Sequence, residues 1–299
     1  MNILQLSDEF KNETKALIFI IQNGLILTDR ICPNNICTHH LKVVQNTSFR
    51  CNLAFQCPNC KKYYSLFTNS LFSDSHIPLN KALYLIYLFS QKVGIKLASH
   101  ETEISQQSVS KFFHNLRIIC DKWTKNHMPL IGGQDDIVQI DESLWSSRKN
   151  NKGRIIEQNW VFGGISMKTQ QCFVRLVPDR SEDTLIFLIL KHIKVGTAIY
   201  SDCWKSYSSL NFLGFKHSTV NHSIQFVNGE TNTQKIERFW KEVKEVKSRY
   251  RGVPHNEIEF HLSEFFWRFN NDVDTENAFE KTLELIKAVI VEIPIDFED

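Results

Sequence analysis

The stretch IVQID, from Ile137 to Asp141, opens the part of the sequence that decides the fold. It is a short run of strand-forming residues, and the runs NWVFGGISM (159–167) and QCFVRLV (171–177) predict two further strands. The next run, SEDTLIFLILKHI (181–193), predicts a helix, because Ser181 can cap its N-terminus and acidic residues fill its first turn. Three consecutive strands followed by a helix indicate a mixed α/β domain.

The sequence after this helix continues to alternate strands and helices. TAIYSD (197–202) predicts a fourth strand, HSTVNHS (217–223) a possible fifth, and TQKIERFWKEVKEVKSRY (233–250) a clear helix. This order is that of an RNase H-like fold, which we expect for residues 135–275. Residues 276–299 are predicted to form a C-terminal helical tail.

Two smaller regions are predicted before this domain. Residues 1–75 hold a Cys/His cluster, and residues 76–130 have the apolar spacing of helices, one from Leu79 to Lys92 and one opening at Ser105. Such a pair fits a helix-turn-helix-like region in which the second helix presents polar residues to a DNA groove, namely Gln106, Gln107, Ser110 and Lys111. The alternative, which the pattern alone favours, is an ordinary helical hairpin that packs on the following domain.

The composition is that of a folded protein. With 299 residues, 42% of them hydrophobic and 12% aromatic, the chain can bury a sizeable core. The net charge of +2 and the pI of about 8.1 are only mildly basic, so affinity for nucleic acid must come from local basic clusters. The N-terminus lacks a basic signal-peptide region, and no apolar run approaches the roughly 20 residues of a membrane span. We therefore expect a soluble intracellular protein with no membrane partner.

Cysteines are concentrated near the N-terminus, where five of the eight fall between positions 32 and 60. Without a secretion signal, this clustering favours metal binding over disulfides. The pairs Cys32/Cys37 and Cys57/Cys60 have the spacing of a zinc ribbon, in which four thiolates hold one structural zinc ion. Other ligands remain open at this point, namely Cys51, His39 and His40, and the alternative to a zinc site is a set of reduced structural cysteines.

Three carboxylates are candidates for catalysis in the predicted α/β domain. Phosphoryl transfer on DNA uses two divalent ions about 3.5 to 4 Å apart, and magnesium or manganese is held by carboxylates from separate segments. Asp141 ends the first predicted strand, Asp202 ends the fourth, and Glu237 lies on the late helix, three places that meet in an RNase H-like sheet. Glu142 is expected on the opposite face of the sheet from Asp141.

The late helix has two adjoining stripes. An apolar stripe includes Trp240, and next to it Glu237, Lys241 and Lys244 follow one another at helical spacing. Glu237 would therefore lie at the edge of the buried face, with lysines beside it for phosphates.

The motifs of the α/β region resemble a known family. IDES, WVFGGI, VPDRSEDTL, YSDCWKSY, VNHSIQFV and TQKIERFWKEVK follow one another between about residues 137 and 270, as in the Merlin-type DDE transposases of eukaryotes and their bacterial insertion-sequence relatives. The resemblance implies an RNase H-like catalytic domain with Asp141, Asp202 and Glu237 as its acids. It also implies cleavage at terminal inverted repeats and insertion by attack of a DNA 3'-hydroxyl. One departure is Asn232, where relatives often have histidine.

Other residues receive supporting roles. Asn221 and His222 are predicted to position DNA or a metal-bound water, or to form a turn after a strand, and Trp240 supports the acidic site from the late helix. Trp204 and Tyr207 could stack on a base or pack behind Asp202, and packing is the favoured interpretation. Contacts to DNA phosphates are expected from two basic groups: Arg148, Lys149, Lys152 and Arg154 after the first strand, and Lys235, Arg238, Lys241, Lys244 and Lys247 on the late helix.

The predicted function is therefore that of a DNA transposase that acts on terminal repeats and target DNA as a homo-oligomer, without a small-molecule substrate. It would work in the nucleus of a eukaryote, or with the chromosome in a bacterial cytoplasm. The alternatives are a captured DNA-binding protein without catalysis and an RNase H-like nuclease that cuts without joining.

Overall fold

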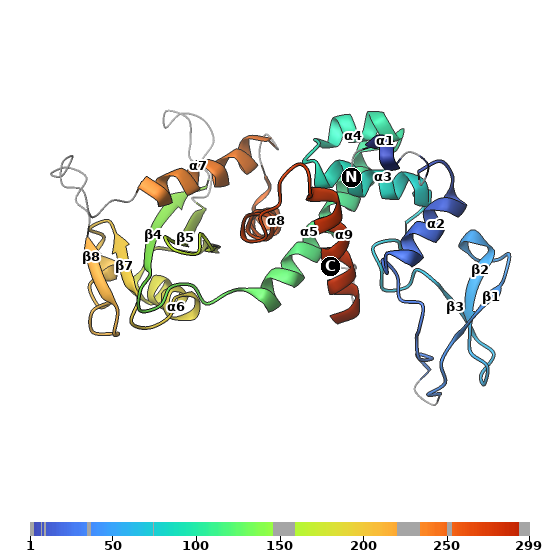
Figure 1. Cartoon of the computed structure of the whole chain (residues 1–299), viewed down its shortest axis with the longest axis horizontal. Helices are drawn as coiled ribbons and strands as arrows, with labels where there is room; N and C mark the ends of the chain where they lie inside the picture. Colours follow the sequence, from blue (N-terminus) through green and yellow to red (C-terminus); the bar gives the residue numbers. More distant parts are fainter. Residues whose placement is uncertain are drawn as a thin grey trace. The chain divides into compact units, whose positions relative to one another are not determined.

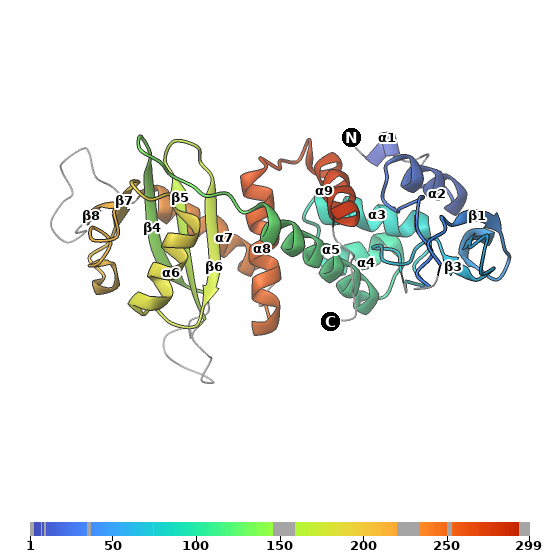
Figure 2. The ribbon, with the colours of Figure 1, turned by 90° about the horizontal axis from the view of Figure 1, so that it is seen from below.

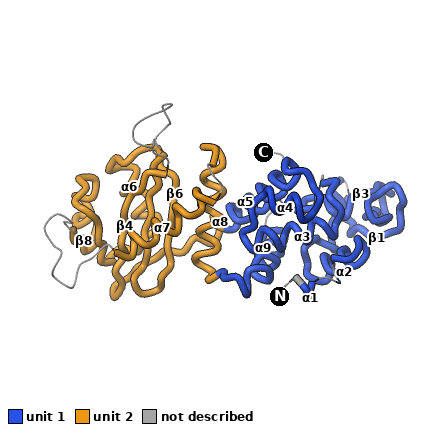
Figure 3. The backbone as a smooth tube through the Cα atoms, turned by 90° about the horizontal axis from the view of Figure 1, so that it is seen from above, with its two compact units in different colours: residues 1–123, 273–299 blue, residues 124–272 orange. Residues whose placement is uncertain are grey.

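The computed structural model describes residues 3–6, 8, 10–34, 37–73, 75–145, 159–219, 234–249 and 253–292. The chain forms two compact units, shown in Figure 3. The first contains residues 1–123 and 273–299, and the second contains residues 124–272. The C-terminal residues 273–299 thus belong to the first unit. None of the described helices is long and apolar enough to cross a membrane.

A five-stranded mixed sheet forms the centre of the second unit. Along the sheet the order is β6-β5-β4-β7-β8. Strand β5 is antiparallel to both β4 and β6, and β7 is parallel to both β4 and β8. The chain order of three strands, a helix and a fourth strand is as predicted. The strands are β4 (Ile137–Leu144), β5 (Trp160–Ser166), β6 (Cys172–Val177), β7 (Ala198–Ser201) and β8 (Lys216–Thr219).

Helices cover both faces of this sheet, as Figures 1 and 2 show. Helix α6 (Glu182–His192) lies on one face, where Leu185 and Ile189 join a core cluster with Val138 and Ile140 of β4. Ser181 caps α6 as predicted, because its side chain accepts a hydrogen bond from the backbone N–H of Thr184.

Helix α7 (Gln234–Arg249) lies on the other face, and its apolar stripe is buried: Ile236, Phe239, Trp240 and Val243. Gly163 of β5 permits this close approach. A Cβ at Gly163 would lie 3.1 Å from a ring carbon of Trp240 and 3.2 Å from one of Phe239. Two helical elements follow, the short 3-10 turn η4 (His255–Glu257) and α8 (Ile258–Asn270), which packs on β6.

A buried histidine makes the stability of the second unit depend on pH. His192 is 3% exposed and stacks on Phe173, with 5.0 Å between ring centroids. Burial lowers the pKa of His192 to about 4, and the charges of Arg175 and Lys191 act in the same direction. The unfolded chain takes up this proton near pH 6.5, whereas the folded chain resists it until near pH 4, so acidification favours unfolding within that window.

We therefore expect the free energy of unfolding to fall by about 2 kcal/mol between pH 7.5 and pH 5 through His192 alone. Urea denaturation at both pH values would measure it, and His192→Phe should flatten the dependence. His255→Gln, at an exposed position of the same unit, is the control and should leave the dependence intact. An equal pH dependence in wild type and His192→Phe would contradict this account.

The first unit combines a small sheet with helices. Its antiparallel sheet has the order β1-β2-β3. The strands are β1 (Lys42–Gln45), β2 (Leu53–Gln56) and β3 (Tyr63–Ser65), with the 3-10 turn η1 (Arg50–Asn52) between the first two. The helices are α1 (Ile3–Leu6), α2 (Glu13–Gln22), α3 (Leu79–Ser90), α4 (Ile95–Thr102), α5 (Gln106–His127, whose last four residues fall in the second unit) and α9 (Ala278–Glu292).

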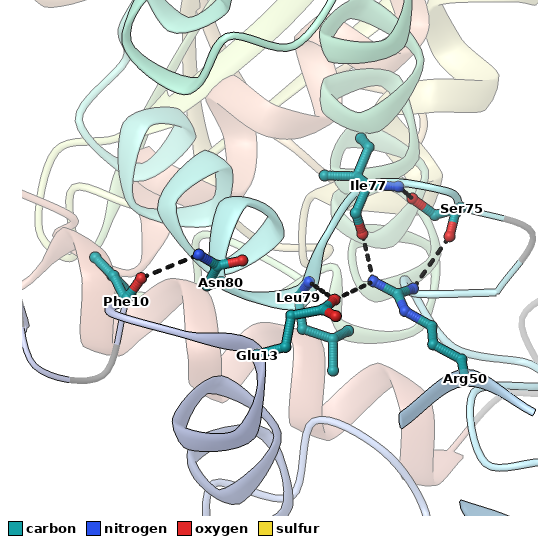
Figure 4. A network of polar contacts seen from close by, with 7 residues as sticks. All are labelled: Phe10, Glu13, Arg50, Ser75, Ile77, Leu79 and Asn80. Atoms are coloured by element: carbon teal, nitrogen blue, oxygen red, sulfur yellow. Dashed lines mark hydrogen bonds and ion pairs between the residues drawn. The ribbon is translucent and has the colours of Figure 1, made fainter. Parts of the chain in front are cut away.

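A polar network joins the small sheet to the helices of the first unit, as Figure 4 shows. Glu13 of α2 accepts a hydrogen bond of 2.8 Å from the backbone N–H of Leu79 and lies 3.6 Å from Arg50. Because Pro78 has no capping side chain, Glu13 satisfies an N–H in the first turn of α3 from outside that helix. Arg50 also donates to the backbone carbonyls of Ser75 and Ile77, so one side chain ties η1 to the entry of α3.

Candidate acidic and cysteine sites

The parallel pairing of β4 with β7 brings two candidate acids together. Gln139 is paired with Tyr200, and two residues farther along each segment lie Asp141 and Asp202. Neighbouring strands are about 4.8 Å apart, so equivalent positions on the two segments meet. Strand β4 continues to Leu144, which corrects the prediction that Asp141 ends the strand. The neighbouring strand β7 ends at Ser201, so Asp202 is the first residue after that strand.

Asp141 faces the helix α7. The indole N–H of Trp240 donates to Asp141 Oδ2 at 3.0 Å, and Asp141 pairs across the sheet with Gly163. Burial, together with the negative charge of Asp202, raises the pKa of Asp141 to about 6. The carboxylate is therefore oriented by Trp240 in a setting that disfavours its charge unless a cation is present.

Glu142 belongs to the same group of acids. Oxygens of Asp141, Glu142 and Asp202 lie within 4.8 Å of one another, and we call these three residues the acidic cluster. Strand alternation does hold, since Glu142 pairs with Phe162 of the α6 face. Although its Cβ lies on the opposite face from Asp141, the carboxylate of Glu142 lies close to those of Asp141 and Asp202.

A tyrosine holds the Glu142 carboxylate in place. The Tyr207 hydroxyl donates to Glu142 Oε1 at 2.5 Å, and Tyr207, in the 3-10 turn η3 (Lys205–Tyr207), is fully buried. Burial raises the pKa of Glu142 to about 7, although the hydrogen bond from Tyr207 opposes the rise. Packing was the favoured interpretation for Tyr207, and it is correct.

Glu237 lies at the start of α7 and is exposed. The start of this helix is fixed to β4, because the backbone N–H of Ile236 donates to Gln139 Oε1 at 3.0 Å. The charge of Glu237 is among the causes of the raised pKa of Asp141, so it acts on the same site. It is not among the three residues whose oxygens lie within 4.8 Å.

The neighbouring acids Asp135 and Asp136 precede β4. Asp136 has a structural role, because it is buried and accepts hydrogen bonds from Ser166 Oγ and from the backbone N–H of Lys168. The acidic cluster suits a divalent cation, since half-buried like charges on hard oxygen ligands are stabilised by a positive partner.

The first unit brings four cysteines together: Cys32, Cys37, Cys57 and Cys60, with ligand atoms all within 4.8 Å of one another. The sulfurs of Cys32 and Cys60 are 3.7 Å apart, and those of Cys37 and Cys57 are 3.2 Å apart. A tetrahedral zinc ion with Zn–S bonds of about 2.3 Å would space them at about 3.8 Å, so the set fits zinc.

Local geometry supports the same conclusion. The backbone N–H of Cys60 donates to the sulfur of Cys57, and Lys61 turns with a positive φ of 58°. A hydrogen bond from the Cys57 thiol lowers the pKa of Cys37 to about 6, whereas burial and the same hydrogen bond raise the pKa of Cys57, so Cys37 is the thiolate of this pair. The alternatives Cys51 and His39 are outside the group of four, although His39 Nδ1 lies 3.7 Å from the Cys37 sulfur.

The predicted phosphate contacts on α7 differ in their surroundings. Lys241 and Lys244 are exposed. Lys247 donates to the backbone carbonyl of Trp145, Lys235 to that of Met167, and Arg238 lies 3.7 Å from Glu242. Seven predicted residues lie outside the described part of the chain: Arg148, Lys149, Lys152, Arg154, Asn221, His222 and Asn232.

The polar residues predicted to face a DNA groove are at the start of α5. Gln106, Gln107, Ser110 and Lys111 are all exposed. The middle segment before them is the helix α4, so two helices joined by a short turn precede this surface. Their role in DNA binding stays a prediction.

A five-stranded mixed sheet with helices on both faces and acids at one edge defines the second unit as an α/β domain of RNase H-like topology. Residues 134–270 match the family model described as the ISXO2-like transposase domain. A Haemophilus influenzae protein described as an uncharacterized transposase-like protein is 29% identical over 116 residues, which are 39% of this chain and 94% of that protein. These two findings support a transposase of the DDE superfamily.

Among solved structures, the catalytic core domain of BIV integrase is similar to this chain with a TM-score of 0.31 and 14% identity. The match covers 44% of this chain and 81% of that chain. The assignment of the fold rests on the strand order and pairing and not on this likeness.

Proposed function

We propose that the chain is a DNA transposase that cleaves the ends of a mobile element and joins a DNA 3'-hydroxyl to target DNA, with divalent metal ions as cofactors. The observation that carries the proposal is the acidic cluster at the end of β7, in a domain similar to transposase domains. The motifs shared with the Merlin type further support that subtype. The four cysteines would hold one structural zinc ion, and the exposed start of α5 would contact DNA.

The residues have separate tasks in this proposal. Asp141, Glu142 and Asp202 would hold the metal, with Glu237 approaching from α7. Divalent ions held there would activate the attacking oxygen and stabilise the leaving oxygen of the phosphodiester. Trp240 orients Asp141 and Tyr207 orients Glu142, so the carboxylates are positioned before any ligand arrives. Lys241 and Lys244 are exposed on the helix that carries Glu237 and would bind phosphates.

The test is strand transfer in vitro with the full chain, magnesium or manganese, and DNA that carries the terminal repeats of the flanking element. Joined products that disappear with EDTA are the expected result. Cleavage without joining would identify a nuclease, and metal-independent binding with neither reaction would identify a captured DNA-binding protein. A homo-oligomer on DNA is expected as well, and light scattering that shows only monomers in the DNA complex would contradict it.

Metal affinity should depend on pH near neutrality. Asp141 and Glu142 keep protons up to about pH 6 and about pH 7, and these protons must leave when metal binds. We expect manganese to bind roughly 20-fold more weakly at pH 6 than at pH 8. Isothermal titration at both pH values measures this, and Glu142→Gln should reduce the difference. An affinity that does not change with pH would contradict the proposed ligands.

A further inference from the structure

A cation and two indoles form a second group beside the acidic cluster. We call Trp160, Arg180 and Trp204 the Trp–Arg–Trp stack. The central carbon of the Arg180 guanidinium lies over both rings, 3.8 Å from the centroid of Trp160 and 4.3 Å from that of Trp204. A guanidinium that lies over aromatic rings keeps its N–H groups at its edge, where they can form paired hydrogen bonds with a phosphate.

The main chain fixes this stack to the segment that carries Asp202. The backbone carbonyl of Arg180 accepts hydrogen bonds from Trp204 Nε1 at 3.2 Å and from Ser206 Oγ at 2.8 Å. The backbone N–H of Trp204 in turn donates to Asp202 Oδ1 at 3.0 Å. These bonds hold the backbone of Arg180 against the segment that carries Asp202, and the two indole rings hold its guanidinium.

The stack adjoins the acids at the same edge of the sheet. Trp160 pairs with Leu144, two residues along β4 from Glu142. Burial raises the pKa of Glu142, and the charge of Arg180 acts against that rise, so the two side chains are within electrostatic reach. In the described part of the chain, however, Arg180 forms no ion pair, which leaves its hydrogen-bonding edge available to a ligand.

Trp204 departs from the packing that was the favoured interpretation. Tyr207, three residues later, is fully buried, but the Trp204 side chain remains 39% exposed. One covering group is Arg180, and the exposed part of the indole offers an apolar surface to a flat ligand. The bases of duplex DNA are covered by their neighbours, so only an unpaired base can stack on such a ring.

We propose that the Trp–Arg–Trp stack binds one unpaired nucleotide of a DNA strand, with Arg180 on its phosphate and Trp204 on its base. This inference rests on the proposed function and names a structural class of substrate, a strand end whose terminal nucleotide is not paired. Clustered carboxylates repel a phosphodiester, and a fixed guanidinium beside them supplies the opposing charge. The nucleotide is held next to the acids that would act on its neighbour.

The test measures binding of a ten-nucleotide oligothymidylate to the full chain by fluorescence anisotropy without metal, over a series of salt concentrations. Arg180→Gln should weaken binding about tenfold and reduce the slope of log affinity against log salt by about 0.7, because one phosphate contact to a single strand is lost. Trp204→Ala should also weaken binding about tenfold, whereas Trp204→Phe should keep most of it. Arg180→Lys should retain the salt slope but lose affinity, because an ammonium group lacks the planar fork.

The matched control is Lys191→Gln, which removes a cation 5.9 Å from the ring of Phe187 on α6, and it should bind like wild type. Wild-type affinity in both Arg180→Gln and Trp204→Ala would overturn the inference. The stack would then have only a structural role. If Arg180→Gln fails to fold, Arg180→Lys and Trp204→Phe decide the question. This test measures DNA binding without metal. It could therefore confirm the inference about the Trp–Arg–Trp stack in a protein that shows no strand transfer, and it could contradict that inference in a working transposase.

Discussion

Asp202→Asn is expected to reduce strand transfer by at least about 10³-fold, which corresponds to about 4 kcal/mol of transition-state stabilisation. Asparagine keeps the Oδ1 acceptor for the backbone N–H of Trp204, so the turn after β7 should survive. What is lost is a negative charge in the acidic cluster. Rates of joined product under single-turnover conditions, with a saturating concentration of DNA, measure the effect.

Thermal unfolding separates this loss from misfolding. Without metal, the variant should be at least as stable as wild type, because one of the three mutually repelling acids of the acidic cluster is gone and the pKa of Asp141 is no longer raised by Asp202. Manganese should raise the melting temperature of wild type but not of Asp202→Asn. Asp135→Asn removes the same charge from an exposed position before β4 and should behave like wild type. A variant that joins DNA at the wild-type rate would refute the role of Asp202.

Cys57→Ser is expected to abolish zinc binding and to unfold the small sheet of the first unit. Cys57 is fully buried and is one of the four clustered sulfurs. A three-stranded sheet of this size has little core of its own, and zinc binding in such modules contributes about 10 to 16 kcal/mol to folding. Zinc content by atomic emission and limited proteolysis of residues 30–70 would record the loss.

The chain supplies its own control for this experiment. Cys51 lies in η1 of the same region but outside the group of four, so Cys51→Ser should retain one zinc ion and resist protease. A Cys57→Ser protein that stays folded and still binds one equivalent of zinc would exclude the four-cysteine site. Loss of zinc from Cys51→Ser but not from Cys57→Ser would shift the site to the alternative ligands.

The order of strands and helices in the second unit could be predicted from sequence because each element has its own local pattern. Ser181 caps α6, and alternation along β4 sends Val138 and Ile140 to one face and Asp141 to the other. The place of Glu142 could not be predicted this way, because alternation fixes where a Cβ points but not where a long side chain ends. The parallel pairing of β4 with β7 places Asp141 level with Asp202, and it thereby brings the adjacent Glu142 close to both. Local sequence patterns do not show this pairing.

The Trp–Arg–Trp stack could not be predicted from local sequence patterns either. Its three members come from a strand, from the connection between β6 and α6, and from the segment after β7. Sequence spacing gives no hint that these segments meet. The motif YSDCWKSY contains one aromatic that is buried and one that is exposed, and only the contacts to Arg180 and Glu142 distinguish them.

The helix α9 packs on α3 within the first unit, and Phe279 contacts Tyr87 and Phe19 with centroid distances of 5.7 and 6.4 Å. Nearly two hundred residues separate α9 from α3 in the chain. A ribosome that adds about 5 to 20 residues per second needs roughly 10 to 40 s to make that interval. During this time the whole second unit is synthesised, and the first unit still lacks its last helix. A nascent chain interrupted after residue 272 would therefore carry the acids of the second unit attached to an unfinished first unit.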